Sequence, residues 1–298
     1  MFKGSNLRGF LLGLLIVAGI ALVVWLRVVG HGPPKPAPPK RPPASARRAD
    51  CDPPGWVRAA EANRASLYAL AWSPFGKPES GWATYAPLVS QEIGARCTAD
   101  SAGFAQSYAV WQVKQKLRAD GVFKADEFDR MRDALALRRP FVQQTAKGRC
   151  PASPPEATLA LARPEESYGG KKIWLRPGAL DAYRRMVAAM KADGLATTAP
   201  LMQIASGYRG PAEEAARCGD GSCDSVARAR CSAHRTGLAL DFYLDHAPGH
   251  DPTSTDAENR RHMAASAEYR WLTANAGRFG FLPYAYEPWH WEWAGEAP

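Results

Sequence analysis

An uncharged run of eighteen residues near the N-terminus, Gly9 to Leu26, sets the first limit on how this chain folds. The run consists mostly of Leu, Val, Ile and Ala, and its length is close to the shortest that spans a bilayer. No small-x-small cleavage site closes the run, which favours an uncleaved anchor over a signal peptide. Residues 1–30 are therefore expected to be a transmembrane helix, and the folded part must be built from the rest.

A proline-rich segment follows at residues 31–50, "HGPPKPAPPKRPPASARRAD". Its seven prolines alternate with cations, so it cannot pack a core and favours an extended polyproline II conformation. At about 3.1 Å per residue such a segment reaches roughly 60 Å. We expect a stalk that holds a domain away from the membrane; a second use for its cations is contact with anionic lipid.

The positive charge of the chain is concentrated in these first fifty residues. Eight Lys or Arg and one acid give this part a charge of +7, which leaves +2 of the total +9 for residues 51–298. The folded part is therefore close to neutral, and a nucleic-acid partner is not indicated, because phosphate binding needs clustered cations on the domain itself. Cations lie on both sides of the apolar run, and counting them alone would place the folded part in the cytoplasm.

Six cysteines divide equally between residues 51–150 and residues 151–298. If all of them pair, an odd number of bridges must connect the two parts. Cys218 and Cys223, in "CGDGSC", are close enough in sequence to close a small turn, but fifteen full pairings remain possible. An even number of cysteines after a terminal apolar segment favours an oxidising compartment. The alternative is that some of the cysteines are buried free thiols.

Residues 51–150 read as a mostly helical domain. Phe104, Tyr108 and Trp111 follow helical spacing, Asp120-Gly121 forms a turn, and "KADEFDRMRDALALRR" is a second amphipathic helix. The helix–turn–helix portion resembles the small three-helix peptidoglycan-binding modules. The alternative is that this part only packs against the rest of the chain and shapes it.

Residues 151–298 mix helices and strands without a regular repeat. We expect a short strand before a helix that starts at Pro177 and closes at Asp193-Gly194, a strand at 201–205, and an alternating strand in "GLALDFYL". A helix stopped by Gly280 and one aromatic strand region, "FLPYAYEPWHWEW", complete the chain. This order predicts an α+β fold with a small antiparallel sheet and flanking helices.

Two histidines and a carboxylate in this part have the composition of a catalytic zinc site. Asp241 lies in the alternating strand, and His234 precedes it by seven residues across a turn that Gly237 makes possible. His290 comes from the last strand region, with Glu287 three residues earlier. Two histidines and one carboxylate leave the fourth position of Zn²⁺ open for water, whose pKa falls to about 7. Glu287 would carry the proton.

Each of these residues alone also has an ordinary structural explanation. A single histidine is more often a structural residue than a ligand, and Asp241 alone could be half of a buried ion pair. His246, His250 and His262 lie in polar surroundings, and we interpret them as solvated. Trp289 and its neighbour Trp291 could exclude water from the metal.

The joint pattern is more specific. "SAHRTGLALD" matches S-x-H-x-x-G-x-A-x-D, "EPWH" matches E-x-x-H, and "SGYR" lies upstream at Ser206 to Arg209. Together they resemble the VanY-type D-alanyl-D-alanine carboxypeptidases, part of a wider group of zinc folds that includes the lysostaphin-like and hedgehog-like proteins. The resemblance covers residues 168–295. It implies zinc ligands at His234, Asp241 and His290, and Glu287 as general base and acid.

The resemblance also implies roles for residues around the metal. Arg209 would hold the substrate carbonyl or terminal carboxylate, and Ser232 would hydrogen-bond within the site. Tyr208 would line the cleft, although it is equally well a core aromatic. Many relatives carry a glutamine a few residues after the arginine, whereas "RGPAEEAARCGDGSC" has acids and a cysteine pair. This departure concerns the substrate side and leaves the metal residues unaffected.

The expected function is that of a zinc-dependent metallopeptidase, which hydrolyses the terminal D-Ala-D-Ala bond of peptidoglycan stem peptides by metal-activated water. The chain would be anchored in the inner membrane with its catalytic domain outside, on the periplasmic or cell-wall side. Alternatives are D,D-endopeptidase or L,D-carboxypeptidase activity on murein, and a non-catalytic cell-wall binding module. A serine mechanism through Ser206 or Ser232 is a further alternative, but no S-x-x-K pattern accompanies it.

Overall fold

The computed structural model describes residues 50–219, 223, 226 and 229–298, and residues 49–298 form one compact unit. The expected anchor, and all of the expected stalk except Asp50, lie outside the described residues. Within the described part, no helix combines the length and the apolarity that a membrane span requires. We call residues 51–150 the helical half and residues 151–298 the sheet half.

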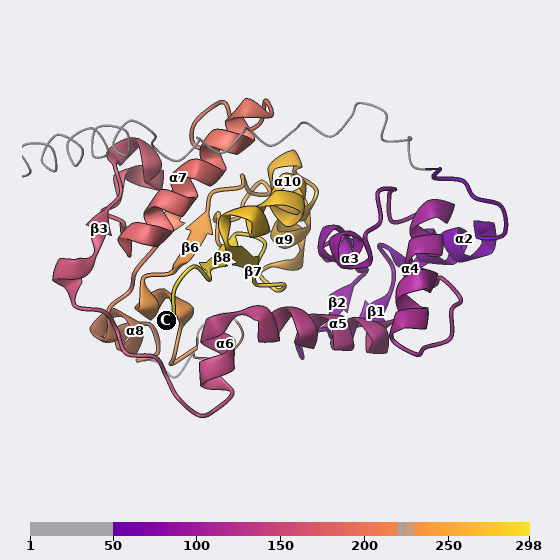
Figure 1. Ribbon diagram of the computed structural model, residues 1–298, viewed down its shortest axis with the longest axis horizontal. Coiled ribbons are helices and arrows are strands. Elements are labelled where there is room, and N and C mark those ends of the chain that lie inside the picture. The colour runs from indigo at the N-terminus through magenta and orange to yellow at the C-terminus, as the bar shows by residue number, and fades with distance from the viewer. Residues whose placement is uncertain (1–49, 220–222, 224–225, 227–228) are drawn as a thin grey trace, which may run out of the picture. The chain divides into compact units, whose positions relative to one another are not determined.

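The helical half is mostly helical, as its periodicity predicts (Figure 1). Phe104 and Tyr108 on the long central helix have no exposed surface, and Trp82 and Phe128 complete the same aromatic core. Its elements are α2 (Val57–Ser66), β1 (Ala71–Trp72), β2 (Glu79–Ser80), α3 (Ala86–Ile93), α4 (Ala102–Lys114), α5 (Ala125–Arg138) and α6 (Pro140–Thr145).

The sheet half contains a four-stranded antiparallel sheet, which confirms the predicted α+β architecture. Its strand order is β5-β6-β8-β7, so the last strand of the chain lies inside the sheet. The strands are β5 (Ile204–Ser206), β6 (Ala239–Phe242), β7 (Phe281–Pro283) and β8 (His290–Trp293). A separate pair, β3 (Ala160–Leu161) and β4 (Trp174–Leu175), lies outside it.

Helix α7 (Pro177–Ala192) packs on one face of this sheet. Pro177 occupies its first turn, where a missing N–H costs nothing, and Asp193 caps its C-terminal end before Gly194 (φ 83°), where the helix was predicted to close. The ring of Tyr183 stacks on that of Phe242, with centroids 5.9 Å apart. The other helices are α8 (Pro211–Arg217), α9 (Ala257–Ala264), α10 (Ala267–Asn275) and the 3₁₀ turns η1 (Glu156–Thr158), η2 (Pro164–Glu166), η3 (Tyr168–Gly170), η4 (Ala233–Thr236) and η5 (Ala276–Phe279).

The expected single strand region at the C-terminus is wrong, because it divides into β7 and β8. A hydrogen bond from Tyr284 N to His290 O closes the loop between them, and two further turns follow within it. Glu287 therefore lies on a loop rather than on a strand. The strand predicted at 201–205 begins three residues later, since Met202 has a left-handed backbone (φ 65°) that no regular strand accommodates.

Three disulfides pair all six cysteines. Cys51–Cys97 lies within the helical half, and Cys150–Cys231 connects the two halves. The third bridge closes the short turn predicted between Cys218 and Cys223. One bridge between the halves satisfies the odd number that the cysteine distribution required.

Candidate metal centre

The sheet sorts its side chains into a core face and a polar face, because successive residues of a strand point to opposite sides. Leu240 and Phe242 of β6 belong to the hydrophobic core. Asp241, between them, points to the polar face and lies directly opposite His290 of β8 in the antiparallel register. Glu292 follows His290 by two residues and therefore shares its face.

His234 reaches the same place from the 3₁₀ turn η4. Ser232 caps this turn by accepting a hydrogen bond from His234 N (3.3 Å). Gly237 ends it in the left-handed conformation (φ 69°), where a side chain would also come within 3.0 Å of Leu159 Cδ2. The turn predicted at this glycine thus returns the chain to β6 and directs the imidazole of His234 toward Asp241.

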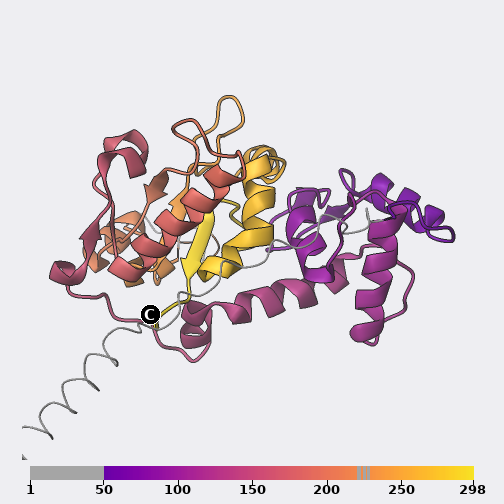
Figure 2. The ribbon, with the colours of Figure 1, turned by 45° about the horizontal axis from the view of Figure 1, so that its top comes forward.

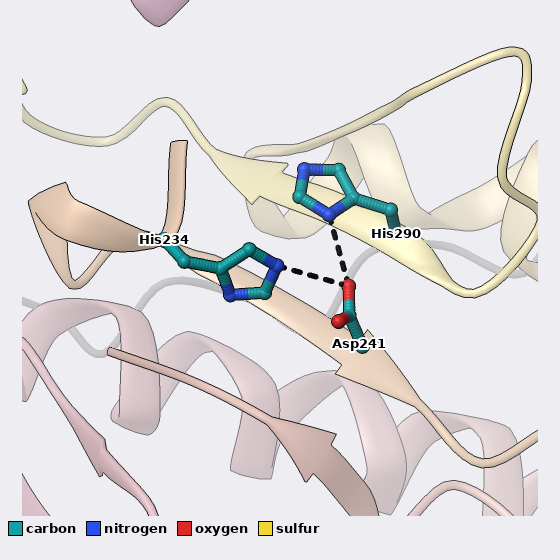
Figure 3. Close-up of side chains that lie close together, drawn as sticks. All are labelled: His234, Asp241 and His290. Atoms are coloured by element: carbon teal, nitrogen blue, oxygen red, sulfur yellow. Dashed lines mark hydrogen bonds and ion pairs between the residues drawn. The ribbon is translucent and has the colours of Figure 1, made fainter. Parts of the chain in front are cut away.

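Figure 3 shows the imidazoles of His234 and His290 converging on one carboxylate oxygen of Asp241. His234 Nε2 lies 3.2 Å from Asp241 Oδ1, and His290 Nδ1 lies 2.9 Å from the same atom. The two rings are 4.9 Å apart between centroids. All three candidate ligand atoms lie within 4.8 Å of one another, and all three residues are buried.

The outer nitrogen of each imidazole is already engaged by an acceptor. Gly207 O lies 2.7 Å from His234 Nδ1, and Glu292 Oε1 lies 3.4 Å from His290 Nε2. A carbonyl or carboxylate oxygen can only accept, so each outer nitrogen carries the hydrogen of a neutral ring. The inner nitrogens then present lone pairs to the Asp241 carboxylate. Three converging lone pairs need a cation between them, which fits a divalent metal.

Burial and the charges of their neighbours shift the pKa of each of the three residues. Burial, together with the nearby charge of Arg209, lowers the pKa of His234 to about 4. Burial also opposes a charged His290, but hydrogen bonds to Asp241 and Glu292 raise the pKa of His290 to about 9. Burial alone would raise the pKa of Asp241, yet the two histidines hold it below its usual value. Without metal, a second proton on the His290 ring, at Nδ1 toward Asp241, supplies the positive charge.

This proton leads to a prediction about metal uptake. Zinc must displace the proton from His290, because a metal ligand has to be unprotonated. The displaced proton makes the apparent zinc affinity rise about tenfold per pH unit, or roughly 100-fold from about pH 6 to about pH 8. Calorimetry in buffers of different ionisation enthalpy should register release of about one proton per zinc. An affinity that stays flat over this range would contradict the assignment.

Glu287 lies on the loop between β7 and β8, three residues before His290. Glu287 N donates to Tyr284 O (3.2 Å), and Glu287 O accepts from His290 N (2.9 Å), so hydrogen bonds fix the backbone on both sides. Burial raises the pKa of Glu287 to about 7, with the charge of His290 pulling the other way. A carboxyl with a pKa near neutrality can both accept and return a proton.

Arg209 approaches the centre from the turn after β5. Its backbone N donates to His234 O (3.2 Å), and its guanidinium donates to Ser206 Oγ (2.9 Å) and Ser232 Oγ (3.0 Å). Among the described residues, its Nε has no hydrogen-bond partner, and the guanidinium forms no ion pair with a carboxylate. A partly buried guanidinium held only by two hydroxyls is suited to receive an anion.

The remaining predicted site residues lie in different surroundings. Tyr208 is partly buried beside Arg209, with its backbone N bonded to Trp174 O (2.8 Å). Trp289 and Trp291 pack in the hydrophobic core, so they support the sheet from the side opposite His290. The expectation that these tryptophans shield the metal from water is therefore wrong, because strand alternation directs them away from it.

The sequence interpretation missed three groups that hold the ligands or their neighbours. Gly207 supplies the carbonyl beneath His234, and a Cβ there would lie 2.7 Å from Ile173 Cγ2. Glu292 follows His290 by two residues, and this spacing in a strand indicates that both side chains lie on the same face. Glu214 of α8, in the acidic stretch after Arg209, is buried and accepts a hydrogen bond from Ser232 N (3.1 Å).

The sheet half matches a known family. Residues 172–296 match the family model of VanY, described as D-alanyl-D-alanine carboxypeptidase. This part of the chain is similar to the VanY family. The matched VanY region contains the converging His–Asp–His group, Glu287 and Arg209, whereas the helical half lies outside it. The comparison with curated proteins finds no match.

Solved structures that resemble part of the chain include an LD-carboxypeptidase and a D,D-pentapeptidase. The LD-carboxypeptidase LdcB is 22% identical, with 49% of this chain and 72% of that chain covered and a TM-score of 0.36. A mutant of the vancomycin resistance D,D-pentapeptidase VanY in complex with Zn(II) is 22% identical, with 49% and 85% covered and a TM-score of 0.29. VanYB in complex with D-alanine-D-alanine is 23% identical, with 48% and 81% covered and a TM-score of 0.29.

Proposed function

We propose that the protein is a zinc-dependent carboxypeptidase that hydrolyses the terminal D-Ala-D-Ala bond of peptidoglycan stem peptides. The observation that carries this proposal is the convergence of His234 Nε2, Asp241 Oδ1 and His290 Nδ1, within the region that is similar to the VanY family. Bound there, zinc would supply a Lewis acid that lowers the pKa of water and polarises a carbonyl oxygen.

Glu287 would carry out the proton transfers of the reaction. Glu287 would take a proton from the attacking water and return it to the leaving amine, which its pKa near neutrality permits. The backbone hydrogen bonds on both sides of Glu287 would keep its carboxylate at the reacting bond. No covalent enzyme intermediate is required, since water attacks directly.

Arg209 would select substrates with a free C-terminus. Its guanidinium has two hydroxyl partners and no carboxylate partner among the described residues, so it would bind the terminal carboxylate. This role distinguishes a carboxypeptidase from an endopeptidase, whose substrate continues beyond the scissile bond.

Replacing Arg209 with glutamine should therefore raise KM for a pentapeptide stem about 10- to 100-fold, as expected for losing a charged hydrogen bond of about 1.5–3 kcal/mol. The same peptide with an amidated C-terminus serves as the control, because it has no carboxylate to lose. Wild type should already turn it over poorly, and Arg209→Gln should be no worse. An equal loss on both substrates would show that Arg209 acts on the scissile carbonyl instead.

The decisive assay is release of D-alanine from a pentapeptide stem by the full chain, with and without a chelator. Release that stops with chelator and returns with Zn²⁺ supports the proposal. Release from a tetrapeptide stem alone would identify an L,D-carboxypeptidase, and cleavage of cross-linked dimers alone an endopeptidase. Binding of the stem without turnover would identify a non-catalytic module.

We also propose an extracytoplasmic location for residues 51–298, anchored in the inner membrane by residues 1–30. Pairing of all six cysteines supports an oxidising compartment. The substrate proposed here would also lie outside the membrane. Digestion of the sheet half by protease added to intact spheroplasts tests this location; protection until the membrane is lysed would refute it.

A further inference from the structure

Arg139 of the helical half lies at the junction between α5 and α6. The following residue is Pro140, which disfavours a helical conformation at Arg139, and the chain is extended there (φ −77°, ψ 121°). This break ends α5 and lets Arg139 leave the helical surface. Figure 2 shows α5 leading from the helical half toward the sheet half, with α6 at its end.

Arg139 makes its contacts in the sheet half, next to the metal centre. Its Nη2 forms an ion pair with Glu292 Oε1, and its guanidinium carbon lies 4.6 Å from the centre of the Tyr284 ring. Only 7% of Arg139 and 3% of Glu292 are exposed. The pair is therefore shielded from solvent, where an ion pair fixes geometry more firmly than at the surface.

Glu292 links this arginine to a proposed metal ligand. Its Oε1, the atom paired with Arg139, also lies 3.4 Å from His290 Nε2. An acceptor at Nε2 keeps the hydrogen there and leaves the lone pair of Nδ1 directed toward Asp241. Without Arg139, Glu292 would be a buried anion with His290 as its remaining partner, free to turn away from the ring.

The energetics do not favour a purely stabilising role for this pair. A buried ion pair costs several kcal/mol to desolvate for each ion, and apolar replacements are often as stable. Arg139 Nε also lacks a hydrogen-bond partner among the described residues. The halves have a second buried bridge, Glu79 Oε1 to Arg260 Nη2 at 2.7 Å, and that bridge contacts no ligand.

We infer that Arg139 is a positioning residue of the metal centre, acting through Glu292 on His290. The helical half then completes a site whose ligands all belong to the sheet half. This inference rests on the proposed function only in requiring that the centre binds zinc. It assigns to residues 51–150 a role in metal binding, whether or not they also bind peptidoglycan.

The test compares zinc dissociation constants of full-chain variants by competition with a chromophoric chelator. Arg139→Gln should bind zinc about tenfold more weakly, the lower end of the effect of losing an outer hydrogen-bond partner of a ligand. Arg139→Lys, which retains the charge, should recover part of the loss. In the Glu292→Gln background, adding Arg139→Gln should change the dissociation constant no further, because the connection is already broken.

Glu79→Gln is the matched control, since it weakens the other buried bridge between the halves without touching His290. It should lower the melting temperature and leave zinc affinity unchanged. Failure of wild type to bind zinc would overturn the proposed function itself. Two outcomes would overturn this inference alone. In the first, wild type binds zinc and Arg139→Gln has the same zinc dissociation constant. In the second, the effects of Arg139→Gln and Glu292→Gln on that constant are additive. If Arg139→Gln does not fold, the zinc dissociation constant of Arg139→Lys is compared with that of wild type instead, and an unchanged constant overturns the inference.

Discussion

Glu287→Gln is expected to lower kcat for D-alanine release by a factor of about 10² to 10⁴, the usual contribution of a general acid–base residue. The amide has nearly the same shape as the carboxylate but cannot accept the proton from water. KM should change little, because substrate binding falls to Arg209 and the metal. Zinc affinity should stay within a few-fold of wild type, since Glu287 is not among the converging ligand atoms.

Steady-state kinetics on a pentapeptide stem, together with metal analysis of the same preparation, measures both quantities. Glu258→Gln is a suitable control, because Glu258 is an exposed glutamate on α9 in the same half. Its kcat should equal that of wild type. Retention of more than a tenth of the activity by Glu287→Gln would exclude Glu287 as the proton carrier and turn attention to another base.

Asp241→Asn is expected to abolish stable zinc binding and, with it, activity. Structural zinc sites bind with about 10–16 kcal/mol from four ligands, so one ligand contributes about 3 kcal/mol or more, over 100-fold in affinity. Asp241 also supplies the negative charge that both imidazoles face. Zinc content after dialysis should fall well below one per chain, and excess zinc should restore only part of the activity.

Asp245→Asn provides the matched control for this change. Asp245 is four residues further along, exposed, and paired with His262 (3.3 Å) away from the centre. Its zinc content should remain that of wild type. Full zinc occupancy in Asp241→Asn would mean that the cation is held elsewhere, and the assignment of this centre would have to be withdrawn.

The convergence of His234, Asp241 and His290 could be anticipated because short-range patterns encode each part of it. Gly237 marks the turn, strand alternation fixes the face of Asp241, and antiparallel pairing places His290 opposite. The α+β class followed from the same alternation of helical and strand patterns. These signals act over a few residues, which is the range over which periodicity and turn chemistry operate.

The missed features depend on contacts that no local pattern records. Arg139 and Glu292 are 153 residues apart, and nothing near Arg139 except Pro140 distinguishes it from the arginines of the preceding helix α5. The division of the last region into β7 and β8 was missed because a continuous aromatic run has no periodicity that marks a loop. Trp289 was assigned to the site by its position beside His290, whereas adjacent strand residues face opposite sides.

The position of β8 has a consequence for the order in which the molecule matures. The ribosome adds β8 after both β6 and β7, yet β8 lies between these two strands in the sheet. A nascent chain that has not reached residue 290 therefore has His234 and Asp241 without His290, and its sheet lacks the strand that lies between β6 and β7. Tight capture of the cation therefore has to wait until residue 290 has been synthesised, and a product ending before residue 290 could complete neither the pairing of β8 with its neighbours nor the metal centre.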